Sequence, residues 1–199
     1  MRIGIDFDNT IACYDGVFHV AARERGLIPD DLPADKNSVR DFLNGSGRKD
    51  DFTALQGYVY GARMDLVSPY PGAADFIAAA RAAGHDVFVV SHKTKTPILG
   101  PAYDMHASAR GFLDAQGLGV EAFFELTKEE KIARAAALRV DAFIDDLPEI
   151  LAMPGLPAQA RALLFDPEGR FPGGRWNGRV FEAHRDWASI AAALLGARV

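Results

Sequence analysis

Short, continuous apolar runs recur along the chain and alternate with longer helical patterns. Runs that short and that uniformly apolar are typical of parallel strands buried on both faces. They lie at residues 2–7, 87–90, 122–124, 142–144 and 162–165, and residues 178–181 are expected to add an edge strand. Helical patterns lie at residues 73–83, 103–116, 128–138 and 187–195. This alternation predicts an α/β fold, a Rossmann-like open parallel sheet with helices on both faces.

The ends of two of these helices are marked by specific residues. The helix at residues 73–83 is followed by Gly84, a residue type that commonly ends a helix. At the start of the helix at 128–138, Thr127 and Glu130 have the spacing of a capping box, in which each side chain accepts a hydrogen bond from a free backbone N–H.

Residues 11–70 do not follow the alternation, because they contain no convincing apolar strand run. Short amphipathic stretches at residues 17–25, 38–43 and 52–62 are each expected to be helical. We interpret the segment as a small α-helical cap inserted after the first strand. The core domain then comprises residues 1–11 and 71–199, and the cap residues 12–70. The alternative is one long, decorated crossover connection.

The composition narrows the class of protein. Of the 199 residues, 49% are hydrophobic, and the formal net charge is -5, which argues against a broad nucleic-acid-binding face. The one cysteine, Cys13, excludes an internal disulfide and a cysteine-ligated zinc site. Asp6 and Asp8 interrupt any secretory signal at the N-terminus. We therefore expect a cytoplasmic protein with a small-molecule partner, and neither a nucleic-acid polymer nor a membrane as partner; the sequence predicts no oligomeric state.

An acidic pair follows the first apolar run. In an extended chain, residues i and i+2 point to the same side, so Asp6 and Asp8 can face one site. Two carboxylates placed together repel each other unless a cation lies between them, and a hard cation such as Mg²⁺ prefers oxygen ligands. Taken alone, the pair is equally compatible with solvated aspartates at a strand end.

Polar residues also follow three other predicted strands. The adjacent pair Asp145 and Asp146 follows residues 142–144, and Ser91 follows residues 87–90. Lys128 lies at a helix start just beyond residues 122–124. Ligands bind beyond the carboxyl ends of the strands in open parallel sheets, so these side chains are expected to share one site. A hydroxyl and an ammonium there can bind a phosphate group.

This ordered set resembles the motifs of the haloacid dehalogenase (HAD) superfamily, specifically its aspartate-nucleophile phosphatases. The motifs are Asp6-Phe7-Asp8-Asn9-Thr10, Ser91, Lys128 and Asp145-Asp146. The resemblance extends from Ile3 to about Pro148, and it implies that residues 11–70 are the helical cap of such enzymes. It also implies that Asp6 attacks phosphorus to form an aspartyl-phosphate, while Asp8 acts as general acid and then general base.

The resemblance implies a metal site as well. Mg²⁺ would be held by Asp6, the backbone carbonyl of Asp8, and Asp146. In the family the metal ligand usually follows a small or acidic residue, which favours Asp146 as the direct ligand and Asp145 as its support.

The remaining roles concern the phosphoryl group and the substrate. Ser91 would bind the transferring group and Lys128 would offset its charge, although Lys131 competes with Lys128 because residues i and i+3 share a helix face. The predicted substrate contacts are Asn9, Thr10, His92 and Lys93. For His92 and Lys93 the alternative is a solvated polar loop. A loop at residues 171–178 is a further candidate to close over the site.

The function expected from the resemblance is Mg²⁺-dependent removal of phosphate from a small phosphorylated metabolite. Asp8 favours phosphate esters, because family members that cleave carbon–halogen bonds lack this second aspartate. One alternative is a nucleoside 5′-monophosphatase similar to the 5′(3′)-deoxyribonucleotidases. Another is a catalytically silent binding or regulatory module.

Overall fold

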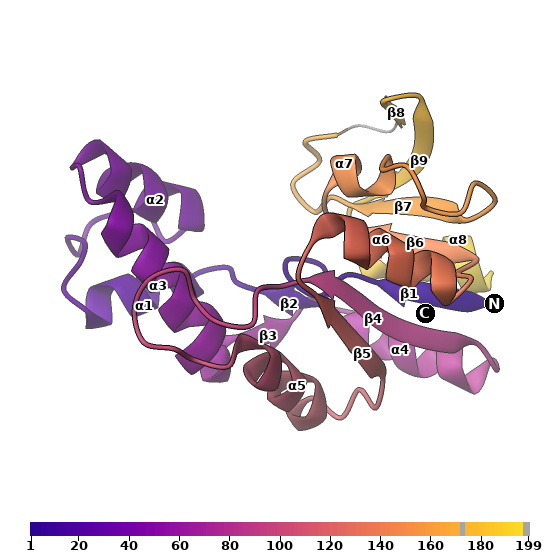
Figure 1. Ribbon diagram of the computed structural model, residues 1–199, viewed down its shortest axis with the longest axis horizontal. Helices are drawn as coiled ribbons and strands as arrows, with labels where there is room; N and C mark the ends of the chain where they lie inside the picture. Colours follow the sequence, from indigo (N-terminus) through magenta and orange to yellow (C-terminus); the bar gives the residue numbers. More distant parts are fainter. Residues whose placement is uncertain (172–173, 197–199) are drawn as a thin grey trace. The chain divides into compact units, whose positions relative to one another are not determined.

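The computed structural model describes residues 1–171 and 174–196, and the contacts within the chain divide it into two compact units (Figure 1). The first unit comprises Met1–Ala12, Pro69–Lys93 and Gln116–Val199, and the second comprises Cys13–Ser68 and Thr94–Ala115. Among the described residues, no helix is long and apolar enough to cross a bilayer.

The first unit is built on a seven-stranded sheet. Its strands are β1 (Arg2–Ile5), β4 (Asp86–His92), β5 (Glu121–Glu125), β6 (Ala142–Asp145), β7 (Arg161–Phe165), β8 (Gly174–Trp176) and β9 (Arg179–His184). Their order is β5-β4-β1-β6-β7-β9-β8, and every pair is parallel except β8 with β9. The predicted α/β fold with a parallel sheet is therefore confirmed.

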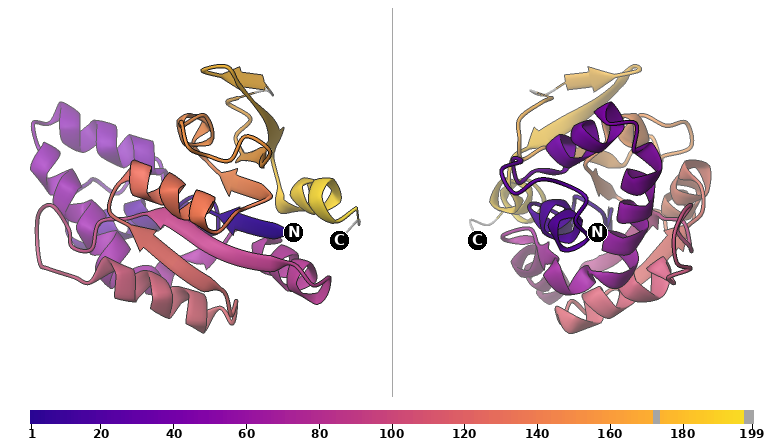
Figure 2. Two further views of the ribbon diagram at one scale, coloured as in Figure 1. Left: turned by 45° about the vertical axis from the view of Figure 1, so that its right-hand side comes forward. Right: turned by 90° about the vertical axis from the view of Figure 1, so that its left-hand side faces the viewer.

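The prediction of an edge strand at residues 178–181 is wrong in one respect. The strand exists as β9, but β8 pairs beyond it and forms the edge, as the yellow hairpin in Figure 2 shows. Asn177 and Gly178 connect the two strands with φ values of 46° and 84°. An Asn-Gly pair with positive φ at both residues is typical of a two-residue hairpin turn, and this signal identifies the extra strand.

Helices cover both faces of this sheet, as predicted (Figures 1 and 2). On one face, α4 (Ala73–Ala82) packs against α8 (Trp187–Leu195), with the rings of Phe76 and Trp187 5.1 Å apart. On the other, α6 (Lys128–Ala137) and the short α7 (Pro148–Leu151), which was not predicted, cover a buried cluster that includes Val90 and Phe143.

Strand β1 lies in the middle of the sheet and pairs on both sides. Ile5 is in register with Val89 of β4 and with Ile144 of β6, so the carboxyl ends of the three strands lie together. The chain continues from β4 to β5 on one side of β1 and then crosses to β6 on the other. Such a reversal of strand order leaves a crevice at the carboxyl ends, where open α/β sheets bind ligands.

The second unit is helical. It contains α1 (Val17–Glu24), α2 (Lys36–Gly45), α3 (Lys49–Ala62), the 3₁₀ helix η1 (Met64–Leu66) and α5 (Met105–Ala115). The first three correspond to the helices predicted within residues 11–70. Short strands β2 (Ala12–Cys13) and β3 (Ser68–Pro69) pair where the chain passes between the units.

The sequence interpretation placed α5 in the core domain, whereas in the structure it packs with residues 13–68 against α3. The reason is a close approach at Gly61, where a Cβ would lie 2.3 Å from Cβ of Tyr103. Ser108 of α5 also donates a hydrogen bond of 2.6 Å to the carbonyl of Gly61.

Candidate active site

A tight turn after β1 places the first acidic pair. The N–H of Asp6 still donates to the carbonyl of Ile144 on β6, at 2.9 Å, and the N–H of Ile11 then folds back to the carbonyl of Phe7 at 3.0 Å. Asn9 has a φ of 58°, a left-handed conformation that asparagine tolerates better than most residues. This turn brings the side chains of Asp6 and Asp8 to the same pocket.

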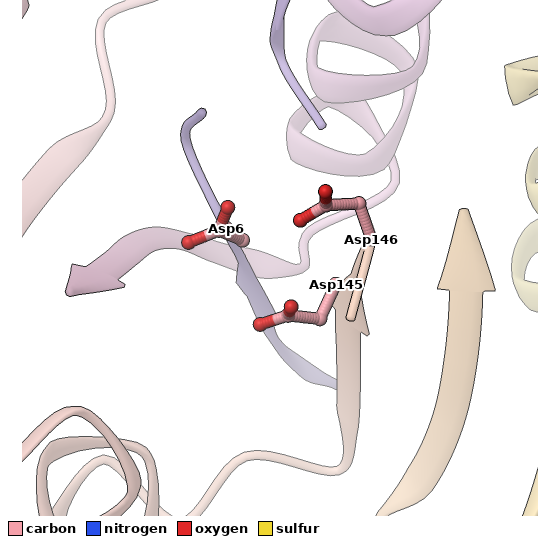
Figure 3. Close-up of side chains that lie close together, drawn as sticks. All are labelled: Asp6, Asp145 and Asp146. Carbon is pink, nitrogen blue, oxygen red and sulfur yellow. The ribbon is translucent and has the colours of Figure 1, made fainter. Parts of the chain in front are cut away.

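Three carboxylates converge where β1 and β6 end. Oxygens of Asp6, Asp145 and Asp146 all lie within 4.8 Å of one another (Figure 3). Asp6 and Asp145 are buried and Asp146 is half-buried. The two strands are neighbours in a parallel sheet, so the residues at their ends necessarily meet. Without cations, so much buried negative charge would strongly destabilise the folded protein.

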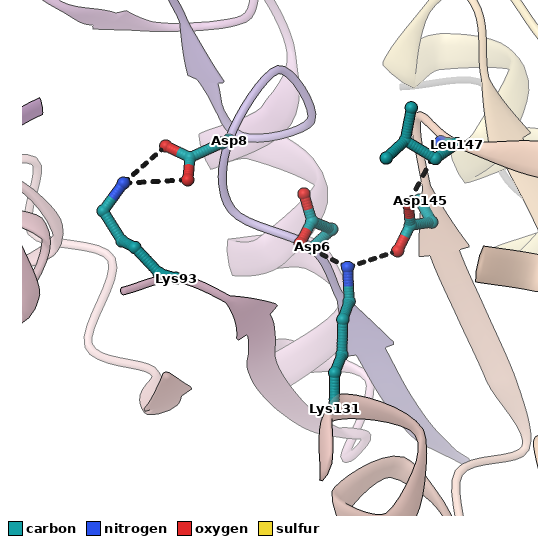
Figure 4. A network of polar contacts seen from close by, with 6 residues as sticks. All are labelled: Asp6, Asp8, Lys93, Lys131, Asp145 and Leu147. Carbon is teal, nitrogen blue, oxygen red and sulfur yellow. Dashed lines mark hydrogen bonds and ion pairs between the residues drawn. The ribbon is translucent and has the colours of Figure 1, made fainter. Parts of the chain in front are cut away.

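One buried ammonium offsets part of this charge. Nζ of Lys131 lies 2.6 Å from Oδ1 of Asp6 and 2.6 Å from Oδ2 of Asp145 (Figure 4). Its side chain is 3% exposed. Burial alone would lower the pKa of Lys131, but the charges of Asp145 and Asp6 outweigh it and raise the pKa above its ordinary value. The predicted capping box of Thr127 and Glu130 is present and fixes the start of α6, one turn before Lys131.

Lys128, which the sequence favoured over Lys131, occupies a different position. It lines the same pocket, but its side chain is 42% exposed and its Nζ lies 3.7 Å from Oε1 of Glu149. Among the described residues, Lys131 is therefore the α6 lysine that contacts Asp6.

The two adjacent aspartates of β6 have different surroundings. Both oxygens of Asp145 are engaged, one by Lys131 and the other by the N–H of Leu147 at 3.0 Å. Asp146 instead lines the pocket. Burial, together with the charges of Asp6 and Asp145, raises the pKa of Asp146 to about 8, and burial raises the pKa of Asp145 to about 7. This arrangement leaves Asp146 and Asp6 as the carboxylates best placed to hold a cation.

The chemistry of this donor set fits a hard divalent cation. The pocket region contains four carboxylates, whereas two buried ammonium groups, those of Lys131 and Lys93, lie against them. With all four carboxylates ionised, two negative charges would be left against these two ammonium groups, and they would be carried by oxygen atoms, the ligands that Mg²⁺ prefers. Mg²⁺ at Asp6 and Asp146 would neutralise them.

Ser91 offers a hydroxyl to the same pocket, whose volume is about 140 Å³. The residue is 1% exposed, and its Oγ has no hydrogen-bond partner among the residues that the structure describes. A buried hydroxyl without a partner costs about 1–3 kcal/mol, so a ligand oxygen is its natural partner. Asn9 and His92 line the pocket beside it.

The remaining predicted substrate contacts lie elsewhere. The described residues that line the pocket do not include Thr10, which is fully buried and accepts a hydrogen bond from Nε1 of Trp187. Lys93 is buried, and its Nζ contacts both carboxylate oxygens of Asp8 (Figure 4). Within the candidate loop at 171–178, residues 172 and 173 lie outside the described part of the chain.

Sequence reasoning missed the contribution of α7 to this pocket. Leu147 and Ile150 form an apolar part of its lining. The signal available was Pro148, two residues after the acidic pair, because proline is favoured in the first turn of a helix.

Comparison with solved structures identifies the fold. A predicted phosphatase from Clostridium acetobutylicum aligns with a TM-score of 0.60 and 13% identity over 98% of each chain. A HAD-superfamily hydrolase from Ehrlichia chaffeensis aligns with a TM-score of 0.58 and 11% identity over 98% of this chain and 96% of the other. The chain has a HAD-type fold. The resemblance inferred from the motifs is thus confirmed at the level of the fold.

Some of the solved structures that match are described as dehalogenases and not as phosphatases. A dehalogenase crystallised with an intermediate aligns with a TM-score of 0.58 and 13% identity over 97% of this chain and 96% of the other. No protein-family model and no curated protein matches the sequence. The identity of the reaction therefore depends on the residues of the site.

The surroundings of Asp146 predict how Mg²⁺ affects stability. Because its pKa is raised in the folded protein, the proton on Asp146 stabilises the fold at low pH, and this contribution is lost as the pH rises towards about 8. Mg²⁺ competes with that proton. We expect Mg²⁺, compared with EDTA, to raise the Tm more at pH 8 than at pH 6, as measured by differential scanning fluorimetry.

The control for this experiment is a change of charge away from the site. Asp146→Asn should abolish the Mg²⁺-dependent shift in Tm, whereas Asp114→Asn, on the exposed side of α5, should leave it unchanged. A shift that is equal at both pH values, or that persists in Asp146→Asn, would contradict the assignment.

Proposed function

We propose that this protein is a Mg²⁺-dependent phosphatase that hydrolyses a phosphate monoester of a small metabolite through an aspartyl-phosphate on Asp6. The observation that carries the proposal is the position of Asp6. Its carboxylate is held by Lys131 next to Asp146, and it lines a pocket that also contains Asp8 and the hydroxyl of Ser91, which has no hydrogen-bond partner within residues 1–171 and 174–196.

Asp6 would act as the nucleophile. One of its oxygens accepts a hydrogen bond from Lys131, which fixes the carboxylate and leaves the second oxygen for attack on phosphorus. A bond then forms between that oxygen and phosphorus while the bond to the alcohol oxygen breaks. Splitting the reaction into two displacements is the advantage of a covalent intermediate.

Asp8 would move the protons. Two residues beyond Asp6 and in the same pocket, it would in its protonated form donate that proton to the departing alcohol oxygen. The resulting carboxylate would then take a proton from the water that attacks the aspartyl-phosphate. This second step releases inorganic phosphate and restores both aspartates.

The remaining groups would bind the phosphate. Ser91 would donate to one phosphate oxygen, and Lys128 at the pocket wall would attract the dianion. Mg²⁺ would be held by Asp6, Asp146 and the backbone carbonyl of Asp8. It would neutralise negative charge, so that the anionic phosphate can bind next to the carboxylates. Asp145 would support the site through Lys131.

Dehalogenation is less well supported. Dehalogenases share the fold, but they need no proton donor for a leaving alkoxide, whereas Asp8 lines the pocket and would be such a donor. A nucleoside 5′-monophosphatase is a more specific form of the same proposal, and the residues around Asp6 are equally suited to it.

The first test is the hydrolysis of p-nitrophenyl phosphate with and without Mg²⁺. We expect Asp6→Asn to abolish phosphate release because an amide cannot replace the nucleophile. Asp8→Asn should reduce phosphate release about 10²–10⁴-fold from an alkyl phosphate assayed in parallel, whose leaving group is basic. Asp114→Asn serves as the control. Wild-type activity in Asp6→Asn would exclude it as nucleophile, and a folded wild-type protein inactive with every divalent metal would indicate a binding module.

A matched pair of substitutions on α6 tests which lysine acts at Asp6. Lys131→Met should lower kcat about 10²–10³-fold, because it removes a preorganised charge from the nucleophile. Lys128→Met should mainly raise KM, since its ammonium is exposed at the pocket wall. Circular dichroism must accompany both, because Lys131→Met leaves two buried carboxylates unpaired. The reverse ranking of the two variants in kcat would contradict the assignment.

A further inference from the structure

Lys93 directly follows a strand, yet its side chain is buried and its backbone N–H is hydrogen-bonded. The strand β4 ends at His92, but the N–H of Lys93 continues the ladder by donating to the carbonyl of Glu125 at 2.8 Å. The Lys93 side chain is only 3% exposed, and its ammonium lies 5.4 Å from the centre of the Phe7 ring. Both the backbone and the side chain are therefore held in place.

The ammonium of Lys93 contacts both oxygens of Asp8. The Nζ–Oδ1 and Nζ–Oδ2 distances are 2.9 and 2.8 Å (Figure 4). Two hydrogen bonds to one carboxylate restrict its rotation as well as its position. Asp8 belongs to a turn and its side chain is 21% exposed, so its orientation is not fixed by burial alone.

The site thus gives each of its two reacting aspartates a separate lysine. Lys131 contacts Asp6 and Asp145, whereas Lys93 contacts Asp8. The Asp8 side chain has a cation of its own and is not needed as a side-chain ligand of the metal. This separation fits two different tasks, attack on phosphorus at Asp6 and proton transfer at Asp8.

We propose that Lys93 is a positioning residue that orients the carboxyl group of Asp8 towards the leaving oxygen, and that it acts through Asp8 and not as a phosphate contact. The inference rests on the proposed function, because it assigns Lys93 a part in the proton transfer by Asp8. It replaces the substrate contact that the sequence suggested for this lysine.

If Lys93 positions Asp8, its loss should make the rate depend more strongly on the basicity of the leaving group. A purely structural role of Lys93 would not have this effect. Proton donation matters most for a basic leaving group such as an alkoxide, and least for p-nitrophenolate, which departs without a proton. A misplaced Asp8 should therefore slow formation of the aspartyl-phosphate, the step that kcat/KM reports, more for alkyl than for aryl phosphates. Hydrolysis of that intermediate is common to all esters and should slow equally for each of them. Loss of a general phosphate contact would slow both kinds of ester equally.

The experiment compares kcat and KM of Lys93→Met for a series of phosphate monoesters whose leaving groups differ in pKa. We expect kcat/KM to fall about tenfold or more for alkyl phosphates and much less for p-nitrophenyl phosphate, in the same order as for Asp8→Asn. Lys93→Arg, which retains the charge and donors, should recover part of the alkyl phosphate activity. Lys95→Met, an exposed lysine on the same segment, is the control and should behave like wild type.

A double-mutant cycle tests whether Lys93 acts through Asp8. The variant with both Asp8→Asn and Lys93→Met should be no slower than Asp8→Asn alone. If Lys93→Met does not fold by circular dichroism, Lys93→Gln replaces it in the same comparison.

Three results would overturn the role of Lys93: an equal loss of kcat/KM for all esters, a raised KM with unchanged kcat, or additive effects in the double mutant. Each would be seen with an active wild-type enzyme. A folded wild type that hydrolyses none of the esters with Mg²⁺ would instead refute the proposed function itself, so the two failures are distinguishable.

Discussion

The buried ammonium of Lys131, placed between Asp6 and Asp145, is the contact on which the site depends. It joins the ends of β1 and β6 to α6 at a largely buried point beside the pocket. Removing one partner from such a buried ion pair typically costs about 3–5 kcal/mol, because the remaining charge is left without compensation. The same contact sets the position of Asp6, the proposed nucleophile, so stability and the proposed reactivity would share one interaction.

One lysine cannot balance this site alone. Asp146 adds a third carboxylate to the cluster, and its raised pKa shows how unfavourable that charge is without a cation. Asp8 is balanced separately by Lys93. Two lysines therefore neutralise two of the four carboxylates, and the charge that is left at Asp6 and Asp146 is the physical basis for a divalent metal.

Much of this arrangement could be predicted because it follows from the strand ends of a parallel sheet. Continuous apolar runs identify the strands, and residues directly after them must meet, as Asp6 and Asp145 do. The choice between Lys128 and Lys131 could not be made this way, since both lie on one helix face and only packing depth separates them. The partner of Lys93 was also hidden, because no local pattern relates it to Asp8, and the packing of α5 depends on a close approach at Gly61.

The most direct test of the account is a crystal structure with Mg²⁺ and beryllium fluoride, which mimics a phosphoryl group on a carboxylate. The account predicts fluoroberyllate attached to Asp6, and one Mg²⁺ about 2.0–2.1 Å from oxygens of both Asp6 and Asp146. Mg²⁺ bound without contact to these two residues, or fluoroberyllate attached to another side chain, would contradict it.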